Sequence, residues 1–68
     1  MIPVLSSSIS RVGYDEALRI LRIEFHNGTL YQYSNVPGME HAALLLAGSL
    51  GRYFNRHIRN NYPYKRIS

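Results

Sequence analysis

The last third of the chain gathers the residue types that bind phosphate. Residues 49–67 hold five of the eight Lys and Arg side chains and four of the eight aromatic residues, and no acidic residue. Arg52, Arg56 and Arg59 follow the spacing i, i+4 and i+7, which places them on one face of a helix. A guanidinium group offers a planar fork of N–H donors that matches a phosphate. The stretch therefore predicts an anion-binding helix; the alternative is an amphipathic surface helix whose arginines only face water.

A nucleotide-type ligand needs more than guanidinium groups, and the same helix offers the rest. An aromatic ring or a histidine can stack on the base, and an amide can bond the edge of the base. Leu50, Phe54 and Ile58 fall on the opposite face and are expected to be buried. We therefore predict a ligand-binding site on the exposed side, to which two tyrosines of a strand are added. Its residues are Arg52, Tyr53, Asn55, Arg56, His57, Arg59, Tyr31 and Tyr33.

Residues that could support catalysis or bind a metal are few. His26, His41 and His57 show no metal-ligand spacing with another His, a Cys or a carboxylate. The serine run 6–8 lacks the G-x-S-x-G pattern of a nucleophile. Glu40 and His57 are a conceivable acid–base pair between two helices, but the sequence does not place them together. We expect a protein that is not an enzyme and has no cofactor and no metal.

Length and composition point to one small domain, residues 1–68 with a core at about 7–67. A chain of this size buries only ~60% of its unfolded surface. With no cysteine to form a disulfide, oligomerisation is the remaining source of buried area, so we predict a homo-oligomer. No run is long enough to cross a membrane. The first ten residues lack the basic and apolar segments of a signal peptide, and we expect a cytoplasmic protein.

Three strands of an antiparallel meander are expected in the first half of the chain. Pro3 and the serine run argue against a regular element in residues 1–7. A turn is expected at Asp15-Glu16-Ala17, whose carboxylates would project into water, and Asn27-Gly28 is a strong hairpin signal. The predicted strands are 8–14, 18–25 and 29–36.

The loop at the hairpin decides which way two tyrosines face. A two-residue loop, Asn27-Gly28, places Tyr31 and Tyr33 on the face opposite Phe25. A three-residue loop, 26–28, with Gly28 left-handed, places them on the same face as the apolar residues of the preceding strand. We favour the three-residue loop because it gives a cleaner apolar face, and then expect both tyrosines to lie mainly in the core with hydroxyls that reach an edge.

Two helices and an extended tail are expected to complete an α+β fold. The first helix spans 37–47, with Asn35 as its cap and Gly48 at its end. Ser49 can cap the second helix, which runs to about Asn60. The tail, 62–67, is expected to fold back over the sheet or to dock on a neighbouring subunit.

With these residues placed, the chain resembles the KTSC family, which is named for a domain at the C-terminus of some lysyl-tRNA synthetases. The resemblance covers roughly residues 6–67, and Gly38, after Pro37, departs from it where the family keeps a better helix former. The family also occurs as free-standing small proteins in bacteria and phages, and the resemblance carries over no catalytic residue. The matching pieces are Ser7-Ser8-Ile9, Val12-Gly13-Tyr14, Ile23-Glu24-Phe25, Gly28, Tyr31-Gln32-Tyr33, Val36-Pro37, Ser49-Leu50-Gly51-Arg52-Tyr53-Phe54-Asn55, Ile58-Arg59 and Tyr62-Pro63-Tyr64.

Three functions remain open, of which we favour the capture of a phosphate-bearing nucleotide-type ligand. The phage context that the resemblance implies is similar to that of anti-defence proteins, so the ligand would be a nucleotide immune signal that the protein sequesters. The synthetase context implies an RNA- or tRNA-binding module, although a net charge of +4 is modest for tracking a polyanion. The third alternative is a protein–protein interaction module, with the Leu-rich helix, Tyr62 and Tyr64 as its interface.

Overall fold

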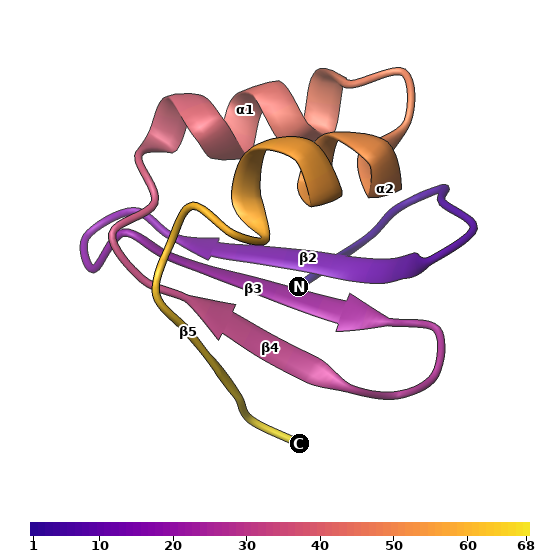
Figure 1. Ribbon diagram of the computed structural model, residues 1–68, viewed down its shortest axis with the longest axis horizontal. Coiled ribbons are helices and arrows are strands. Elements are labelled where there is room, and N and C mark those ends of the chain that lie inside the picture. The colour runs from indigo at the N-terminus through magenta and orange to yellow at the C-terminus, as the bar shows by residue number, and fades with distance from the viewer.

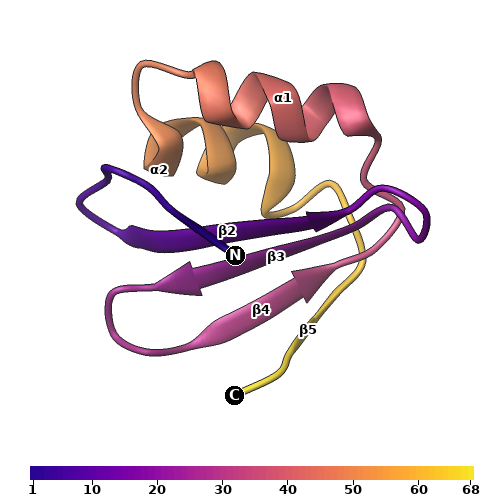
Figure 2. The ribbon, with the colours of Figure 1, turned by 180° about the vertical axis from the view of Figure 1, so that it is seen from behind.

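The computed structural model describes all 68 residues. Its elements, in chain order, are β1 (Ile2–Pro3), β2 (Ile9–Asp15), β3 (Ile20–Phe25), β4 (Leu30–Tyr33), α1 (Gly38–Leu46), α2 (Leu50–Tyr53), a π-helical turn η1 (Phe54–Ile58) and β5 (Tyr64–Arg66). The five strands form one antiparallel sheet in the order β1-β2-β3-β4-β5. Both helices lie on the same face of this sheet, as the two opposite views show (Figures 1 and 2).

The α+β class, the antiparallel sheet and the two helices are confirmed, but the expected three-stranded meander is wrong. β1 adds an edge strand to β2, with Ile2 opposite Val12. Proline is tolerated there because an edge strand does not need every N–H for the sheet. At the other edge, β5 pairs with β4 instead of folding over the sheet (Figure 1). Two- and three-residue strands of this kind carry no alternation, so only the pairing reveals them.

The register at the hairpin follows the three-residue loop that the apolar pattern favours. Tyr33 lies opposite Leu21, and Tyr31 lies opposite Ile23. The Phe25 N–H donates to the carbonyl of Thr29 at 2.9 Å, and Gly28 has a φ of +88°, which glycine adopts without strain. Both tyrosines therefore point toward the helices.

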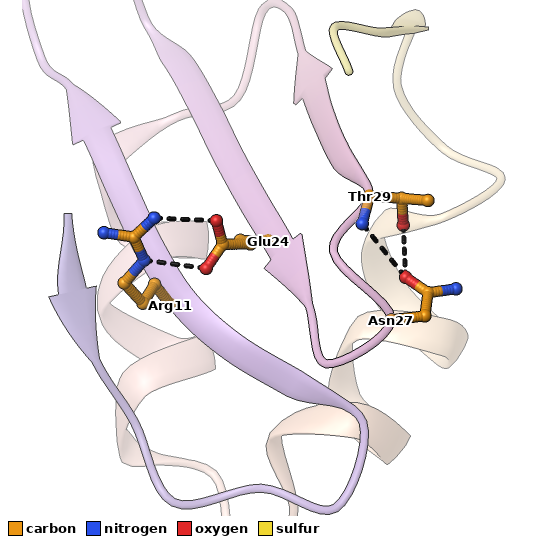
Figure 3. A network of polar contacts seen from close by, with 4 residues as sticks. All are labelled: Arg11, Glu24, Asn27 and Thr29. Atoms are coloured by element: carbon orange, nitrogen blue, oxygen red, sulfur yellow. Dashed lines mark hydrogen bonds and ion pairs between the residues drawn. The ribbon is translucent and has the colours of Figure 1, made fainter.

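Side chains within the loop fix its shape. The Asn27 Oδ1 accepts hydrogen bonds from the Thr29 N–H at 3.0 Å and from the Thr29 hydroxyl at 2.7 Å (Figure 3). Asparagine favours turns because its short side chain can satisfy nearby backbone groups. The loop is held by contacts that are encoded within it.

The core lies between the sheet and the helices. Its members share nearly complete burial and an apolar body: Ile9, Val12, Leu21, Ile23, Tyr33, Val36, Leu44, Phe54 and Ile58. The other face of the sheet is polar. There Arg11 forms a two-armed ion pair with Glu24, both contacts at 2.7 Å (Figure 3), and this hydrogen bonding lowers the pKa of the Glu24 carboxyl. Because only one face of the sheet is buried, apolar and polar residues alternate along its strands.

The boundaries of the predicted strands shift at the turn between β2 and β3. β3 begins at Ile20, not at residue 18, because Leu18 and Arg19 belong to the turn, where Arg19 has a φ of +56°. Asp15 is the last residue of β2, and its Oδ1 accepts a hydrogen bond from the Leu18 N–H at 3.1 Å. This carboxylate therefore closes a turn.

The caps of the first helix also differ from expectation. α1 follows Pro37 with no side-chain cap, and Asn35 instead has a left-handed φ of +62°. The helix ends at Leu46, followed by an extended Ala47, so Gly48 does not serve as its left-handed cap. The predicted cap of the second helix is confirmed, because the Ser49 hydroxyl accepts from the Arg52 N–H at 3.3 Å.

Candidate functional site

The second helix widens after its first turn, and this divides the predicted arginine face. The Arg59 N–H donates to the carbonyl of Phe54 at 2.9 Å, five residues back. A π turn takes more residues than the 3.6 of an α-helical turn, so each later side chain lags behind its α-helical position. Arg52 and Arg56 consequently line one hollow, and Arg59 lines another. The eight predicted site residues fall into two groups of four.

The first group belongs to what we call the aromatic hollow, a cavity of about 580 Å³. Its position between the helix and the β3–β4 hairpin brings together residues from distant parts of the chain. It contains the predicted Tyr31, Tyr33, Asn55 and Arg59. The full lining is Ser7, Ser8, Phe25, His26, Asn27, Thr29, Tyr31, Tyr33, Phe54, Asn55, Arg59, Asn60 and Tyr64.

Five rings of this hollow contact one another. Phe54 packs edge-on against Phe25 at 5.5 Å and against Tyr33 at 5.4 Å, measured between ring centroids. Tyr64, on the edge strand β5, lies 5.9 Å from Tyr31 and 5.5 Å from Tyr33. Tyr64 is 59% exposed, so the rings run from the core to the surface without a break.

Tyr33 links the core to the hollow. The residue is only 3% exposed, yet it lines the hollow. Its hydroxyl makes no hydrogen bond within the protein, and it is not sealed from solvent, because no buried polar side-chain atom lacks a partner. Burial raises the pKa of Tyr33 to about 12, although the positive charge of Arg59 acts in the opposite direction. The hydroxyl is thus a neutral donor that nothing in the protein uses.

The polar part of the lining favours an anion over a cation. Arg59 forms no ion pair, since the single ion pair of the chain joins Arg11 to Glu24. The lining contains no Asp or Glu, and it includes the side-chain amides of Asn27, Asn55 and Asn60. Such a site offers rings, amides and one guanidinium group to a ligand.

The second group lines the basic hollow, a shallow and open depression of about 420 Å³. All of its residues come from one short stretch around the start of the second helix. It contains the predicted Arg52, Tyr53, Arg56 and His57 together with Ala47, Gly48 and Ser49. The ring centroids of Tyr53 and His57 lie 4.3 Å apart, with the ring planes tilted by 31°. Two arginines without ion pairs face one opening here.

The conceivable acid–base pair of Glu40 and His57 is not formed. The Glu40 carboxylate instead accepts hydrogen bonds from the hydroxyls of Tyr53 at 2.5 Å and Tyr62 at 3.1 Å. Its hydrogen bond is the main cause that raises the pKa of Tyr53 to about 12. Burial is the first cause, and the Glu40 hydrogen bond the second, of the raised pKa of Tyr62. This network ties α1 to the second helix and to Tyr62, which lies two residues before β5.

Several residues of the aromatic hollow were missed by sequence reasoning. Ser8 lies close to the start of the second helix, where a Cβ on Gly51 would come within 2.6 Å of the Ser8 hydroxyl oxygen. His26 reaches the same segment, with its Nε2 2.8 Å from the carbonyl oxygen of Ser6. The sequence contained a partial signal for His26 and Asn27, because the favoured three-residue loop, 26–28, joins the strand that carries Tyr31 and Tyr33. No signal in the sequence brings the serines or Tyr64 to this place.

The other features bearing on function add little. His41 stacks on Tyr14 at 4.6 Å, and burial lowers the pKa of His41. No group of three His, Cys, Asp or Glu side chains is placed to hold a metal ion. No helix has the length and apolar character needed to cross a membrane.

Comparison with known proteins places the chain in a family. The KTSC domain profile matches residues 5–62, and the chain therefore belongs to the KTSC domain family. The crystal structure of a KTSC domain protein from Yersinia pestis superposes with a TM-score of 0.91 at 39% sequence identity, covering 97% of this chain and 93% of that one. The resemblance seen in the sequence motifs is confirmed.

Two relatives show the range of proteins that carry this domain. An uncharacterized protein of Stutzerimonas stutzeri is 45% identical over 67 residues, which are 97% of this chain and 94% of that protein. A lysine–tRNA ligase of Nostoc punctiforme is 32% identical over 62 residues, which are 91% of this chain but 11% of the ligase. The domain thus forms almost all of one protein and a small part of the other.

Proposed function

We propose that this KTSC domain protein binds a nucleotide-type ligand with a phosphate group in the aromatic hollow and releases it unchanged. The observation that supports this most is an unpaired guanidinium, Arg59, beside an unused hydroxyl, Tyr33, in a ring-lined cavity without acidic residues. Cavities of roughly 300–1,000 Å³ hold small ligands and cofactors, and the hollow has about 580 Å³.

Each part of such a ligand has a partner in the hollow. A base can stack on Tyr64, which is 59% exposed, or on the neighbouring Tyr31. The amides of Asn27 and Asn55 can bond the edge of a base. Arg59 can hold the phosphate through its planar fork. Because the lining holds one arginine, we propose a ligand with a single phosphate group at this site.

Isothermal titration calorimetry with the four nucleoside monophosphates tests this proposal. At least one should bind with one ligand per chain, and Arg59→Ala should weaken it roughly tenfold or more, as expected when a hydrogen bond to a charged group is lost. Tyr33→Phe keeps the ring but removes the hydroxyl, so it should weaken binding less. The bound ligand, recovered after heat denaturation, should be unmodified.

Arg22→Ala is the matched control. It removes the same charge from β3, where the neighbours Leu21 and Ile23 face the core and Arg22 faces the other side of the sheet. Its affinity should equal that of the wild type. Equal losses in the Arg59 and Arg22 variants, or no binding of any monophosphate, would contradict the proposal. A chemically changed product would instead show an enzyme.

RNA binding is the second candidate, and it rests on the likeness to a stretch of lysine–tRNA ligases. Of the eight Lys and Arg side chains, only Arg11 takes part in an ion pair, so seven are available to phosphates. Binding of single-stranded RNA or tRNA by such a spread surface should fall steeply with salt. A ligand held in the hollow should show a shallow salt dependence.

The homo-oligomer, the cytoplasmic location and the role in phage anti-defence also remain proposals. Met39 and Leu46 on α1 are 85% and 86% exposed, and a second copy of the chain would cover them. Light scattering at high micromolar concentration should give a mass above that of one chain. A mass equal to that of one chain would contradict the proposed oligomer, but it would not bear on the proposed nucleotide binding.

A further inference from the structure

The basic hollow combines two guanidinium groups with a deficit of negative charge. Arg52 and Arg56 line it and are exposed, and neither forms an ion pair. They are separated by four residues, which is about 6 Å along a helix axis. Two long side chains at this separation can both reach one small, multiply charged anion.

The acidic residues of the chain do not neutralise this hollow. None of the four lines it. Glu24 is paired with Arg11 on the far face of the sheet, and Asp15 closes the turn after β2. Glu40 is bonded to a lining residue, because its carboxylate oxygens accept hydrogen bonds from the hydroxyls of Tyr53 and Tyr62. Its charge therefore lies at the hydroxyl end of Tyr53, while the guanidinium groups line the opening.

The rings of the hollow favour a phosphate group over a base. The ring centroids of Tyr53 and His57 lie 4.3 Å apart, with the ring planes tilted by 31°, so one face of each ring is already occupied by the other. The lining otherwise consists of Ala47, Gly48 and Ser49, which offer no ring for stacking. The Ser49 oxygen accepts from the Arg52 N–H, which leaves its own O–H able to donate to an oxyanion.

We propose that the basic hollow is a second binding site, separate from the aromatic hollow, that binds two linked phosphate groups through Arg52 and Arg56. This site does not depend on the proposed nucleotide site, because the two hollows share no lining residue. Two sources can present a pair of phosphate groups to these arginines: a small molecule with a diphosphate, or consecutive phosphodiesters of an RNA backbone, which are separated by a ribose.

Titration of the full chain with inorganic pyrophosphate, followed by amide NMR spectra, tests the site. The shifts should concentrate between residues 47 and 57, the stretch that holds the lining. Arg56→Ala should weaken binding roughly tenfold or more. Arg56→Lys should also lose affinity, because it keeps the charge but not the fork. The exposed position of Arg56 means that these variants should retain the wild-type spectrum without ligand.

Two controls separate this site from its alternatives. Arg59→Ala should leave pyrophosphate binding unchanged, and so should Arg22→Ala. Shifts scattered over the cationic surface, with an equal loss in the Arg22 variant, would mean nonspecific binding and would overturn the proposal. Shifts confined to the aromatic hollow would overturn it as well. Failure of the monophosphate experiment together with success here would refute only the proposed nucleotide site, and the reverse result would refute only this one.

A single-stranded oligouridylate identifies the source of the phosphates. If the RNA backbone occupies the basic hollow, Arg56→Ala weakens oligonucleotide binding and pyrophosphate competes with it. If the source is a small molecule, Arg56→Ala weakens pyrophosphate binding alone. Both outcomes support the site and decide the source. A variant that weakens neither ligand would overturn the proposal.

Discussion

The two hollows lie against the same helix, yet they are built in different ways. All residues of the basic hollow lie between 47 and 57. The aromatic hollow draws on the N-terminal segment, the β3–β4 hairpin, the second helix and β5. The basic hollow is a local feature of one helix and the loop before it. The aromatic hollow exists only when the whole domain is folded.

This difference predicts how each site is coupled to stability. Tyr33 and Phe54 belong both to the core and to the aromatic hollow. No buried residue lines the basic hollow, where Arg52 and Arg56 are exposed. Changes in the aromatic hollow should therefore mix effects on folding and binding, whereas changes in the basic hollow should separate them.

The largest effect is expected from Tyr33→Ala. It removes a ring that is 97% buried, by difference from its 3% exposure, and aromatic-to-alanine changes in cores cost ~3–5 kcal/mol. The whole stability of a domain is ~5–15 kcal/mol, so the variant should be close to unfolding. Urea denaturation measures the loss.

Tyr64→Ala is the matched control for that experiment. Tyr64 contacts the same ring cluster but is 59% exposed, so its loss should destabilise the fold far less. If both variants unfold at the same urea concentration, the aromatic hollow is not graded from core to surface, and the contrast with the basic hollow fails.

Alkaline pH should lower the stability of the fold by ionising one tyrosine in the core, Tyr33, and one tyrosine that joins the two helices, Tyr53. The folded-state pKa values of Tyr33 and Tyr53 are raised to about 12, above the ~10 of an unfolded tyrosine. The neutral hydroxyls are therefore favoured in the fold. Their contribution to stability is fully present below pH ~10 and is lost as the pH rises toward about 12. Urea denaturation across this range should show the decline, and Tyr53→Phe should make it shallower.

A double-variant experiment tests whether the two hollows are independent. Arg56→Ala and Arg59→Ala should each affect a different ligand, so the double variant should bind each ligand as weakly as the single variant that changes the lining of its hollow, and no more weakly. Calorimetry with a monophosphate and with pyrophosphate supplies both measurements. If the double variant binds either ligand clearly more weakly than that single variant, one ligand spans both hollows.

The smallest effect is expected for the stability of Arg56→Ala. An exposed residue with no ion pair should change the free energy of unfolding by no more than ~0.5 kcal/mol. A clear destabilisation, seen in urea denaturation, would show that the arginine packs on the helix and is part of the structure.

Much of the fold could be predicted from the sequence because its signals are local. Alternation in residues 21–25 placed Leu21 and Ile23 in the core, and the turn at Gly28 set the register of Tyr31 and Tyr33. The two edge strands, β1 and β5, escaped prediction because their pairing partners are distant along the chain. Backbone pairing at an edge leaves no pattern in side chains of such short segments.

The sequence by itself determined which residue types the candidate sites contain. The spacing of Arg52 and Arg56 within a single helix was enough to place both at one opening. Only the tertiary structure showed that Arg59 lines a different hollow from Arg52 and Arg56, because a π turn depends on hydrogen bonds that no periodicity reveals. It alone also brought Arg59 to Tyr33, since burying the apolar face of the second helix fixes what its other faces meet.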